Sequence, residues 1–237
     1  MRISIFLVLM LLSAAVRADN AAVTAAPVKR IGIYVIPYYQ SAETADGTPR
    51  VSVAKAYDTK LSSNRPEDIV AVRDDVMAHP EFVTPMTMMV LAVRLYDVGL
   101  RDDAVFWFYV AKNRYVTMAS VLDMKSSALS QAEDATKNFA ALAGPVINSY
   151  AFCDIEKQSA TKSRALAWVE QHPYQALFLE QLPALSGERK ENLKQAIARL
   201  KDGAETERKY LVDPKNFEQF KKQRDANHVA EQFCWDV

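Results

Sequence analysis

From Pro66 onward, hydrophobic residues recur at the spacing of amphipathic helices. Between Pro66 and Pro80, Ile69, Val72 and Val76 share one face. Proline suits both the first turn of a helix and the position just beyond its end, so this segment is predicted as a helix with both boundaries marked.

The next apolar run predicts a second helix with equally clear ends. Thr84 is a suitable N-cap, Pro85 suits the first helical position, and Gly99 suits the position after the last turn. Later segments give weaker boundaries. In chain order, the expected features are an apolar face at Ala135, Phe139 and Leu142, a break at Gly144-Pro145 with a new helix after it, helices over 160–171 and 174–182 separated by His172-Pro173, an apolar stripe from Leu193 to Ala204, and a last helix opened by Asp213-Pro214.

Two short runs rich in valine, isoleucine and tyrosine lie before these helices and flank a loop with Asp46-Gly47. They predict a β-hairpin over residues 30–58 with a long loop. An isolated hairpin is unstable in water, so this one must pack on the helices. The expected fold is mainly α, a helical bundle carrying an N-terminal β-hairpin, in a single domain over 30–237.

Residues 1–18 have the order of a secretory signal peptide: one basic residue, a short apolar core and small residues ending at Ala18. We expect cleavage after Ala18 and a soluble periplasmic or secreted protein. The alternative is an N-terminal membrane anchor, but the apolar run is short for a spanning helix. Residues 19–29 are alanine-rich without a pattern and are expected to form a flexible lead-in.

Composition and charge exclude some classes of function. The chain is 50% hydrophobic and 24% charged, which is typical of a folded protein. Removing residues 1–18 leaves 27 basic and 29 acidic residues, without a basic cluster. Nucleic-acid binding needs several cations to neutralise phosphates, so it is not expected. No second segment is apolar enough to span a membrane after signal cleavage.

The chain contains two cysteines, Cys153 and Cys234. An even number in an exported protein suggests a disulfide. Apolar neighbours on both sides leave two buried free thiols as the alternative.

The segment 99–115 is unusually aromatic and could be a strand, a helix or a ligand-binding cluster of rings. Asp102 and Asp103 precede the rings and Lys112 and Arg114 follow them, which is the charge order of a helix. The rings in question are Phe106, Trp107, Phe108, Tyr109 and Tyr115. A helix that is apolar nearly all round is central, so these rings are predicted to be core, with a ligand-binding cluster as the alternative.

Small residues at Ala92, Gly99, Ala104 and Ala111, with Phe108 among them, give 85–115 the pattern of one helix pair. This resembles a single tetratricopeptide or Sel1-like unit, in which small residues let two antiparallel helices approach closely. No second copy follows at the repeat length, so an array is not expected. The longer strings TPMTMMVLAVRLYDVGLRDDAVFWFYVAKNRY, GPVINSYAFCD and WVEQHPY look like a group of uncharacterised exported bacterial proteins.

The sequence lacks the common catalytic and cofactor motifs, such as G-x-S-x-G, H-E-x-x-H, C-x-x-C and the phosphate-binding loop. His79, His172 and His228 are scattered without metal-ligand spacing. We therefore expect no cofactor or metal and assign no catalytic residue. Distant carboxylates brought together by the fold would still allow an enzyme.

The second predicted helix is apolar except for a stripe of Thr87, Arg94 and Asp97. Arg94 can face water, pair internally, or project into a ligand groove. An arginine before an aspartate is the less favoured order for a helix-surface pair, so the groove is our working hypothesis. Helix packing suggests further groove residues, and the predicted binding set is Arg94, Asp97, Asn148, Asp154, Trp168 and Tyr174.

The sequence thus favours an exported helical module that binds an envelope protein or peptide, its ligand unidentified. The alternative is an envelope hydrolase whose acidic residues come from separate helices. Carboxylates about 5 to 10 Å apart in a deep cleft would favour the hydrolase.

Overall fold

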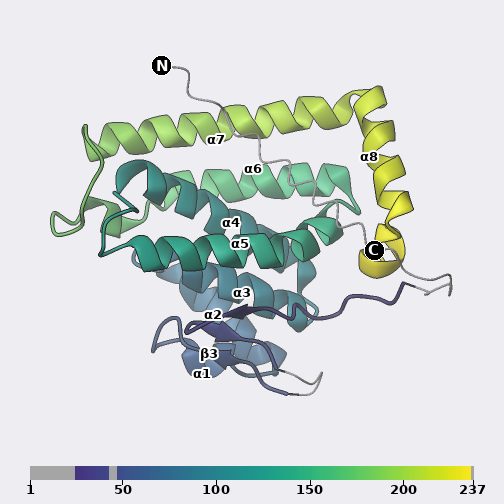
Figure 1. Ribbon diagram of the computed structural model, residues 1–237, viewed down its shortest axis with the longest axis horizontal. Coiled ribbons are helices and arrows are strands. Elements are labelled where there is room, and N and C mark those ends of the chain that lie inside the picture. Colours follow the sequence, from purple (N-terminus) through teal and green to yellow (C-terminus); the bar gives the residue numbers. More distant parts are fainter. Residues whose placement is uncertain (1–24, 43–46, 236–237) are drawn as a thin grey trace.

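The computed structural model describes residues 25–42 and 47–235, so the predicted signal peptide lies outside the described residues. Helices dominate, and a small sheet lies near the N-terminal end of the described chain. Figure 1 shows the layers: the sheet with α1 and α2 at one end, α3, α4 and α5 in the middle, and α7 at the opposite end. The prediction of a mainly α protein with a β-hairpin is confirmed.

The elements of the described residues are few and mostly long. The helices are α1 Asp58–Leu61, α2 Pro66–Ala78, α3 Pro85–Asp97, α4 Arg101–Val121, α5 Ser130–Ala151, α6 Ile155–Gln171, the 3-10 helix η1 Gln175–Phe178, α7 Arg189–Val212, α8 Pro214–Ala226 and α9 Val229–Phe233; the strands are β1 Tyr34–Val35, β2 Tyr39–Gln40 and β3 Arg50–Val51. None of these helices is both long and apolar enough to cross a membrane.

The three strands form one antiparallel sheet in the order β1-β2-β3. Strands β2 and β3 form the expected hairpin, with Tyr39 opposite Val51. The first predicted run contains two strands, because the chain turns back at the cis Ile36–Pro37 bond. Tyr39 is buried edge-on against Phe139 of α5, so the sheet packs on the helices as required for its stability.

Helices α3 and α4 pack against each other more extensively than any other pair among the described elements. Thr84 caps α3 by accepting a hydrogen bond from the Thr87 amide, as its position predicted. Gly99 lies between the two helices with φ of 87°, a left-handed conformation that favours glycine. The boundaries of α2 and α3 predicted from proline and glycine are therefore confirmed.

Helix α4 is the centre of the protein and also contacts α5, α6 and α7 (Figure 1). Phe106, Trp107, Phe108 and Tyr109 are all buried, each no more than 6% exposed. The rings contact one another and neighbouring aromatic side chains, as in the edge-on contact of Trp107 with Trp168. The prediction of a core helix over this segment is confirmed.

The predicted break at Gly144-Pro145 is wrong, because α5 continues through both residues. Pro145 removes one backbone hydrogen bond, but it and Ala141 lie on the exposed side of the helix, where water can replace that bond. Gly144 faces the core, where an added Cβ would lie 3.3 Å from the Phe108 ring. Here glycine allows α5 to approach α4 closely and does not interrupt the helix.

The predicted helix over 174–182 is also wrong, since only the 3-10 turn η1 forms there. Its amide at Gln175 donates to Glu81 O, and Leu177 is buried in a small cluster with Met118 and Leu122. These tertiary contacts fix one turn and leave no continuous helical face. The preceding helix α6 starts earlier than predicted, at Ile155, where Asp154 accepts from the Lys157 amide.

The predicted disulfide between Cys153 and Cys234 is present, with Cα atoms 5.6 Å apart. It joins the residues just after α5 to the end of α9. Asp213-Pro214 does open α8, and α9 follows it as a further short helix. Near the bridge, the Val28 amide donates to Gln232 O, so the described end of the predicted lead-in pairs with the C-terminal segment.

Candidate functional site

An open groove of about 760 Å³ lies between α6 and α7. Its size falls within the range of small-molecule and peptide-side-chain sites. The apolar part of its lining comes from both helices and includes Leu166, Ala167, Ala204 and Leu211. The rest of the lining is polar and charged, and its contacts are described below.

The groove follows from the sequence of α7. Its first half packs on α4 and α6 through Ala196 and Ile197, both buried. No residue between Ile197 and Leu211 is fully buried, because that stretch is rich in Lys, Glu and Arg. The second half of α7 therefore stands beside α6 without a packed apolar seam, which leaves the groove open.

Polar contacts bridge the groove from one helix to the other. Lys162 Nζ lies 2.6 Å from Glu207 Oε2, and Lys201 Nζ lies 2.7 Å from Glu170 Oε1. Gln158 Nε2 donates to Glu207 Oε1 at 3.1 Å. These pairs connect α6 to α7 across the groove, where Ala167 is exposed and Leu166 and Leu211 are buried.

The polar contacts continue inward to α4 and α5. Tyr109 OH accepts a hydrogen bond from Gln158 Nε2 at 3.1 Å and donates to Asn148 Oδ1 at 3.3 Å. Burial raises the pKa of Tyr109, so its hydroxyl stays protonated. Gln158 is only 3% exposed, and it connects Glu207 of the groove to this inner pair.

Two of the six predicted binding residues lie near this groove. Asn148 is reached through Tyr109, as described above. Asp154 caps α6 and lines a small pocket that Gln158 also lines. The structure therefore brings Asn148 and Asp154 to the same region, at the end of α6 that faces α5.

Arg94 and Asp97 lie elsewhere and do not line a groove. Arg94 is 1% exposed, and its Nη1 donates to Asp97 Oδ2 at 2.6 Å. Its Nη2 donates to Ser63 O at 2.8 Å and Asn64 Oδ1 at 2.9 Å. Asp97 Oδ1 accepts from the Ile31 amide at 2.8 Å. The groove hypothesis for these two residues is corrected: Arg94 pairs internally and joins α3 to the sheet end.

The weak attraction expected for this order of residues applies to a solvated helix surface. Here the pair is buried, so its energy is set by desolvation and by the surrounding hydrogen bonds. Burial raises the pKa of Asp97 to about 6, although Arg94 and the Ile31 amide oppose that shift.

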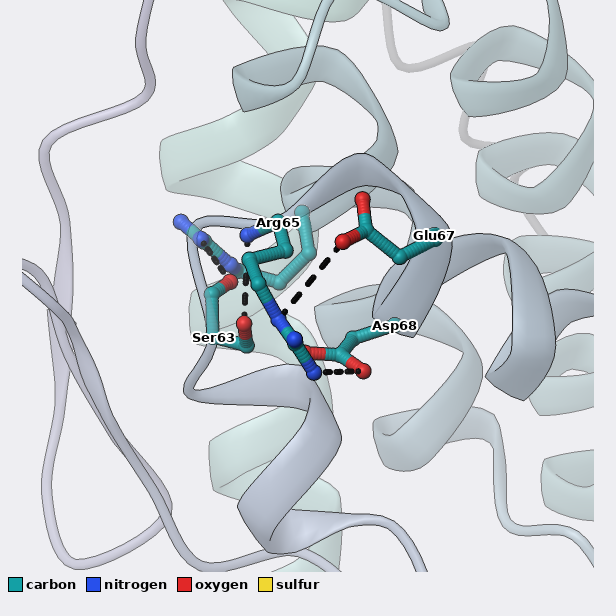
Figure 2. Close-up of polar contacts among 5 residues, drawn as sticks. Ser63, Arg65, Glu67 and Asp68 are labelled. Carbon is teal, nitrogen blue, oxygen red and sulfur yellow. Dashed lines mark hydrogen bonds and ion pairs between the residues drawn. The ribbon is translucent and has the colours of Figure 1, made fainter.

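On its outer side, this buried network meets an exposed group of charges at the start of α2. Ser63 Oγ accepts from the Arg65 amide at 3.1 Å, and Arg65 Nε lies 2.8 Å from Asp68 Oδ2 and 3.7 Å from Glu67 Oε1 (Figure 2). Ser63 thus contacts Arg94 through its carbonyl and Arg65 through its hydroxyl. Arg65 and its acidic partners lie at the protein surface, so their pairs add little stability and form no enclosed site.

Trp168 and Tyr174, the last two predicted residues, lie at a third place beside Arg114. The Arg114 guanidinium carbon lies 5.3 Å from the Trp168 ring and 5.5 Å from the Tyr174 ring. Arg114 also donates to the carbonyls of Pro80, Val83 and His172. This cluster ties α4 to the loops after α2 and α6 and is closed. The six predicted residues therefore occupy three separate places.

Sequence reasoning missed the groove residues Gln158, Lys162 and Glu207. Gln158 and Lys162 are four residues apart and share a helix face. That spacing was the available signal, but it is equally typical of a solvated surface. Only the packing of α7 against α6 distinguishes it.

Three of the four carboxylates that line the groove are ion-paired, and Glu156 is the exception. Glu170 and Glu207 are each paired with a lysine, and Arg208 lowers the pKa of Glu205 to about 2. A general acid instead needs a carboxyl with a raised pKa. The described residues include no group of histidine, cysteine and acidic side chains that could hold a metal ion.

The fold and groove define a mainly helical protein with a ligand-sized site between two helices. The chain is similar to an uncharacterized protein of Haemophilus influenzae, with 37% identity over 234 residues, covering 99% of this chain and 90% of that relative. The chain belongs to the same family as that protein. No protein-family model matches the sequence. No solved structure matches it.

Proposed function

We propose that this protein is an exported helical binding module that holds a peptide segment of an envelope protein in the groove between α6 and α7. The observation that supports this function is the groove itself: a ligand-sized opening with apolar side chains between bridging ion pairs. Apolar lining with a few placed polar groups is typical of binding sites.

The hydrolase alternative has less support. The groove carboxylates Glu170, Glu205 and Glu207 are paired with cations, and Asp97, whose pKa is raised to about 6, is buried in the Arg94 network. A substrate would meet the first three as carboxylates already paired with cations, and it would not reach the buried Asp97. The groove therefore favours recognition over acid–base chemistry.

The resemblance of α3 and α4 to a tetratricopeptide unit stays a proposal about helix-pair geometry. Ala104, Phe108 and Ala111 are all buried in the region where α3, α4 and α5 meet. Because this pair forms the core, we assign the binding face to α6 and α7 instead.

A photo-crosslinking amino acid at Ser163, an exposed position that lines the groove, is expected to join the protein covalently to its partner in cells. Ala167→Trp should fill the groove and abolish the product, because an indole occupies most of the apolar space that a peptide side chain would enter. Ala78→Trp, at the exposed end of α2, is the matched control and should leave the product unchanged. Cross-linked species are measured by mass spectrometry.

Two outcomes of this experiment contradict the proposal. One is the absence of any product from position 163. The other is a cross-linked product whose yield is the same with and without Ala167→Trp. A partner that still binds when the groove is filled must bind elsewhere.

The proposed export gives a separate prediction: the mature protein should start at Asp19, because small residues end the signal-like segment at Ala18. Mass spectrometry of the periplasmic fraction checks this N-terminus. Ala18→Trp is the control and should block cleavage, since the cleavage site requires a small residue. Recovery of the unaltered chain with intact Met1 in the membrane pellet would contradict the assignment.

A further inference from the structure

The Cys153–Cys234 disulfide lies near the surface, outside the hydrophobic core. Both cysteines are half-buried, and Cys153 borders a small surface pocket of about 20 Å³ that Tyr150, Asp154 and Lys157 also line. Helix α9, which ends just before Cys234, contains no buried residue. The bridge is therefore within reach of a thiol from the solvent, and little packing holds the segment that carries Cys234.

One arginine contacts both sulfur atoms of the bridge. Arg224 Nη2, from α8, lies 3.7 Å from Cys153 Sγ and 3.6 Å from Cys234 Sγ, and it donates to Ser149 O at 3.0 Å. The side chain is half-buried against the Phe220 ring, and in the described part of the chain it makes no ion pair with a carboxylate. A partly desolvated cation is normally paired with an anion, because its lost hydration is costly.

Reduction of the bridge would supply that anion. A disulfide sulfur is uncharged, whereas a cysteine thiol with an ordinary pKa of about 8.5 ionises more easily beside a cation. Arg224 therefore stabilises the reduced form more than the oxidised form. Charged side chains of the neighbouring turns are exposed, so water screens their effect on the sulfurs: Lys29, Asp102, Asp154, Lys157, Asp225 and Glu231.

We propose that the Cys153–Cys234 bridge is a thiol-exchange site that a dithiol protein of the same compartment reduces reversibly. This inference goes beyond the binding function and does not depend on the groove. It assigns to Arg224 the role of holding a thiolate at either sulfur.

The exchange has two steps. A thiolate of the reductant attacks Cys153 Sγ, which borders the pocket; a new S–S bond forms as the Cys153–Cys234 bond breaks, and Cys234 leaves as a thiolate beside Arg224. The second thiol of the reductant then loses its proton, attacks the mixed disulfide and releases Cys153. The reductant supplies two electrons and two protons and ends as a disulfide.

The first test equilibrates the whole protein with mixtures of reduced and oxidised glutathione and measures the reduced fraction by alkylation and mass spectrometry. At pH 9, Arg224→Gln should make the bridge about tenfold harder to reduce, equivalent to about 30 mV, because a charge-assisted contact to a thiolate is lost. The difference should shrink toward pH 6, where the thiols of both proteins take up protons. Arg224→Lys should keep most of the effect. Lys215→Gln, which removes an exposed cation elsewhere on α8, is the matched control and should change nothing.

The second test needs only the unaltered chain and decides the proposal if Arg224→Gln fails to fold. After reduction, the rate of alkylation by iodoacetamide at different pH values should show one thiol with a pKa well below about 8.5. Brief treatment of the oxidised protein with reduced glutathione, followed by acid quenching and peptide mapping, should place glutathione on Cys153.

Four outcomes overturn the proposal. The first is equal reduction of the unaltered protein and Arg224→Gln at pH 9, and the second is a reduced protein in which neither thiol has a lowered pKa. The third is glutathione found only on Cys234, which contradicts the attack at Cys153. The fourth is a bridge that glutathione opens only after urea has unfolded the protein, since such a bridge is purely structural.

Discussion

Replacing Arg94 by alanine is expected to lower the free energy of unfolding by about 3 to 5 kcal/mol, because removing one partner of a buried ion pair leaves the other charge buried and unpaired. Arg94 is 1% exposed and its guanidinium contacts Asp97, Ser63 and Asn64. The substitution thus strands Asp97 and also leaves two oxygen acceptors without this donor. Urea unfolding monitored by circular dichroism measures the loss.

The size of this loss should depend on pH in a defined direction. In the folded protein the pKa of Asp97 is about 6, above the ordinary value of 3.8, so ionising this carboxyl opposes folding. Without Arg94 its pKa must rise further. The variant should therefore lose most stability above that higher pKa and recover part of it as the pH falls and Asp97 takes up a proton. The difference from the unaltered protein should be smaller at pH 5 than at pH 8.

Arg65→Ala is the matched control for Arg94→Ala. Arg65 also pairs with a nearby aspartate, but its side chain is 68% exposed, so its removal should not measurably change stability (Figure 2). A loss at Arg94 as small as the loss at Arg65 would mean that the buried network contributes nothing. A loss that grows toward low pH would contradict the role given to Asp97.

Replacing Trp107 by alanine is expected to cost about 3 to 5 kcal/mol, as deletions of large core aromatics do. The indole is 1% exposed and lies 5.4 Å, between ring centroids, from both Phe106 and Trp168. Its removal therefore leaves a cavity between α4 and α6 that these rings cannot fill without moving. Phe108→Ala should cost a similar amount, because that ring is equally buried and lies so close to Gly144 of α5 that an added Cβ there would be 3.3 Å from it.

Denaturant unfolding measures both losses, with Phe82→Ala as the control. Phe82 is 63% exposed in the loop before α3, and its truncation should change stability by no more than about 0.5 kcal/mol. If Trp107→Ala or Phe108→Ala were as mild as this control, that ring would not be part of the core, and the ligand-binding alternative for the aromatic segment would return.

The sequence determined the features whose physics is local or depends on composition. Thr84, Pro85 and Gly99 set the ends of α3, because capping and backbone restrictions act within a few residues. The aromatic helix α4 was predictable as core, because side chains that are apolar on every face must be covered. The Cys153–Cys234 bridge was predictable because only one pairing of two cysteines exists.

Tertiary structure decided the features where one local pattern allows several outcomes. The Gly144-Pro145 pair predicts a helix break from local sequence, yet α5 continues through it. Pro145 faces outward, and Gly144 lets α5 lie close to Phe108. The sequence allowed three environments for Arg94. In the folded protein Ser63 and Ile31 lie beside α3 and hydrogen-bond to Arg94 and Asp97, so Arg94 is buried in an internal ion pair.

The candidate site depends most completely on tertiary structure. Gln158 and Lys162 lie on α6 and Glu207 lies on α7, and each has the local pattern of a solvated helix surface. Only the course of α7, which is buried at Ile197 and again at Leu211 but not between them, brings these three residues to one groove. The sequence alone determined that these helices form and which of their faces are apolar. The distance between the helices, and therefore the groove, is set by long-range packing, which local patterns do not encode.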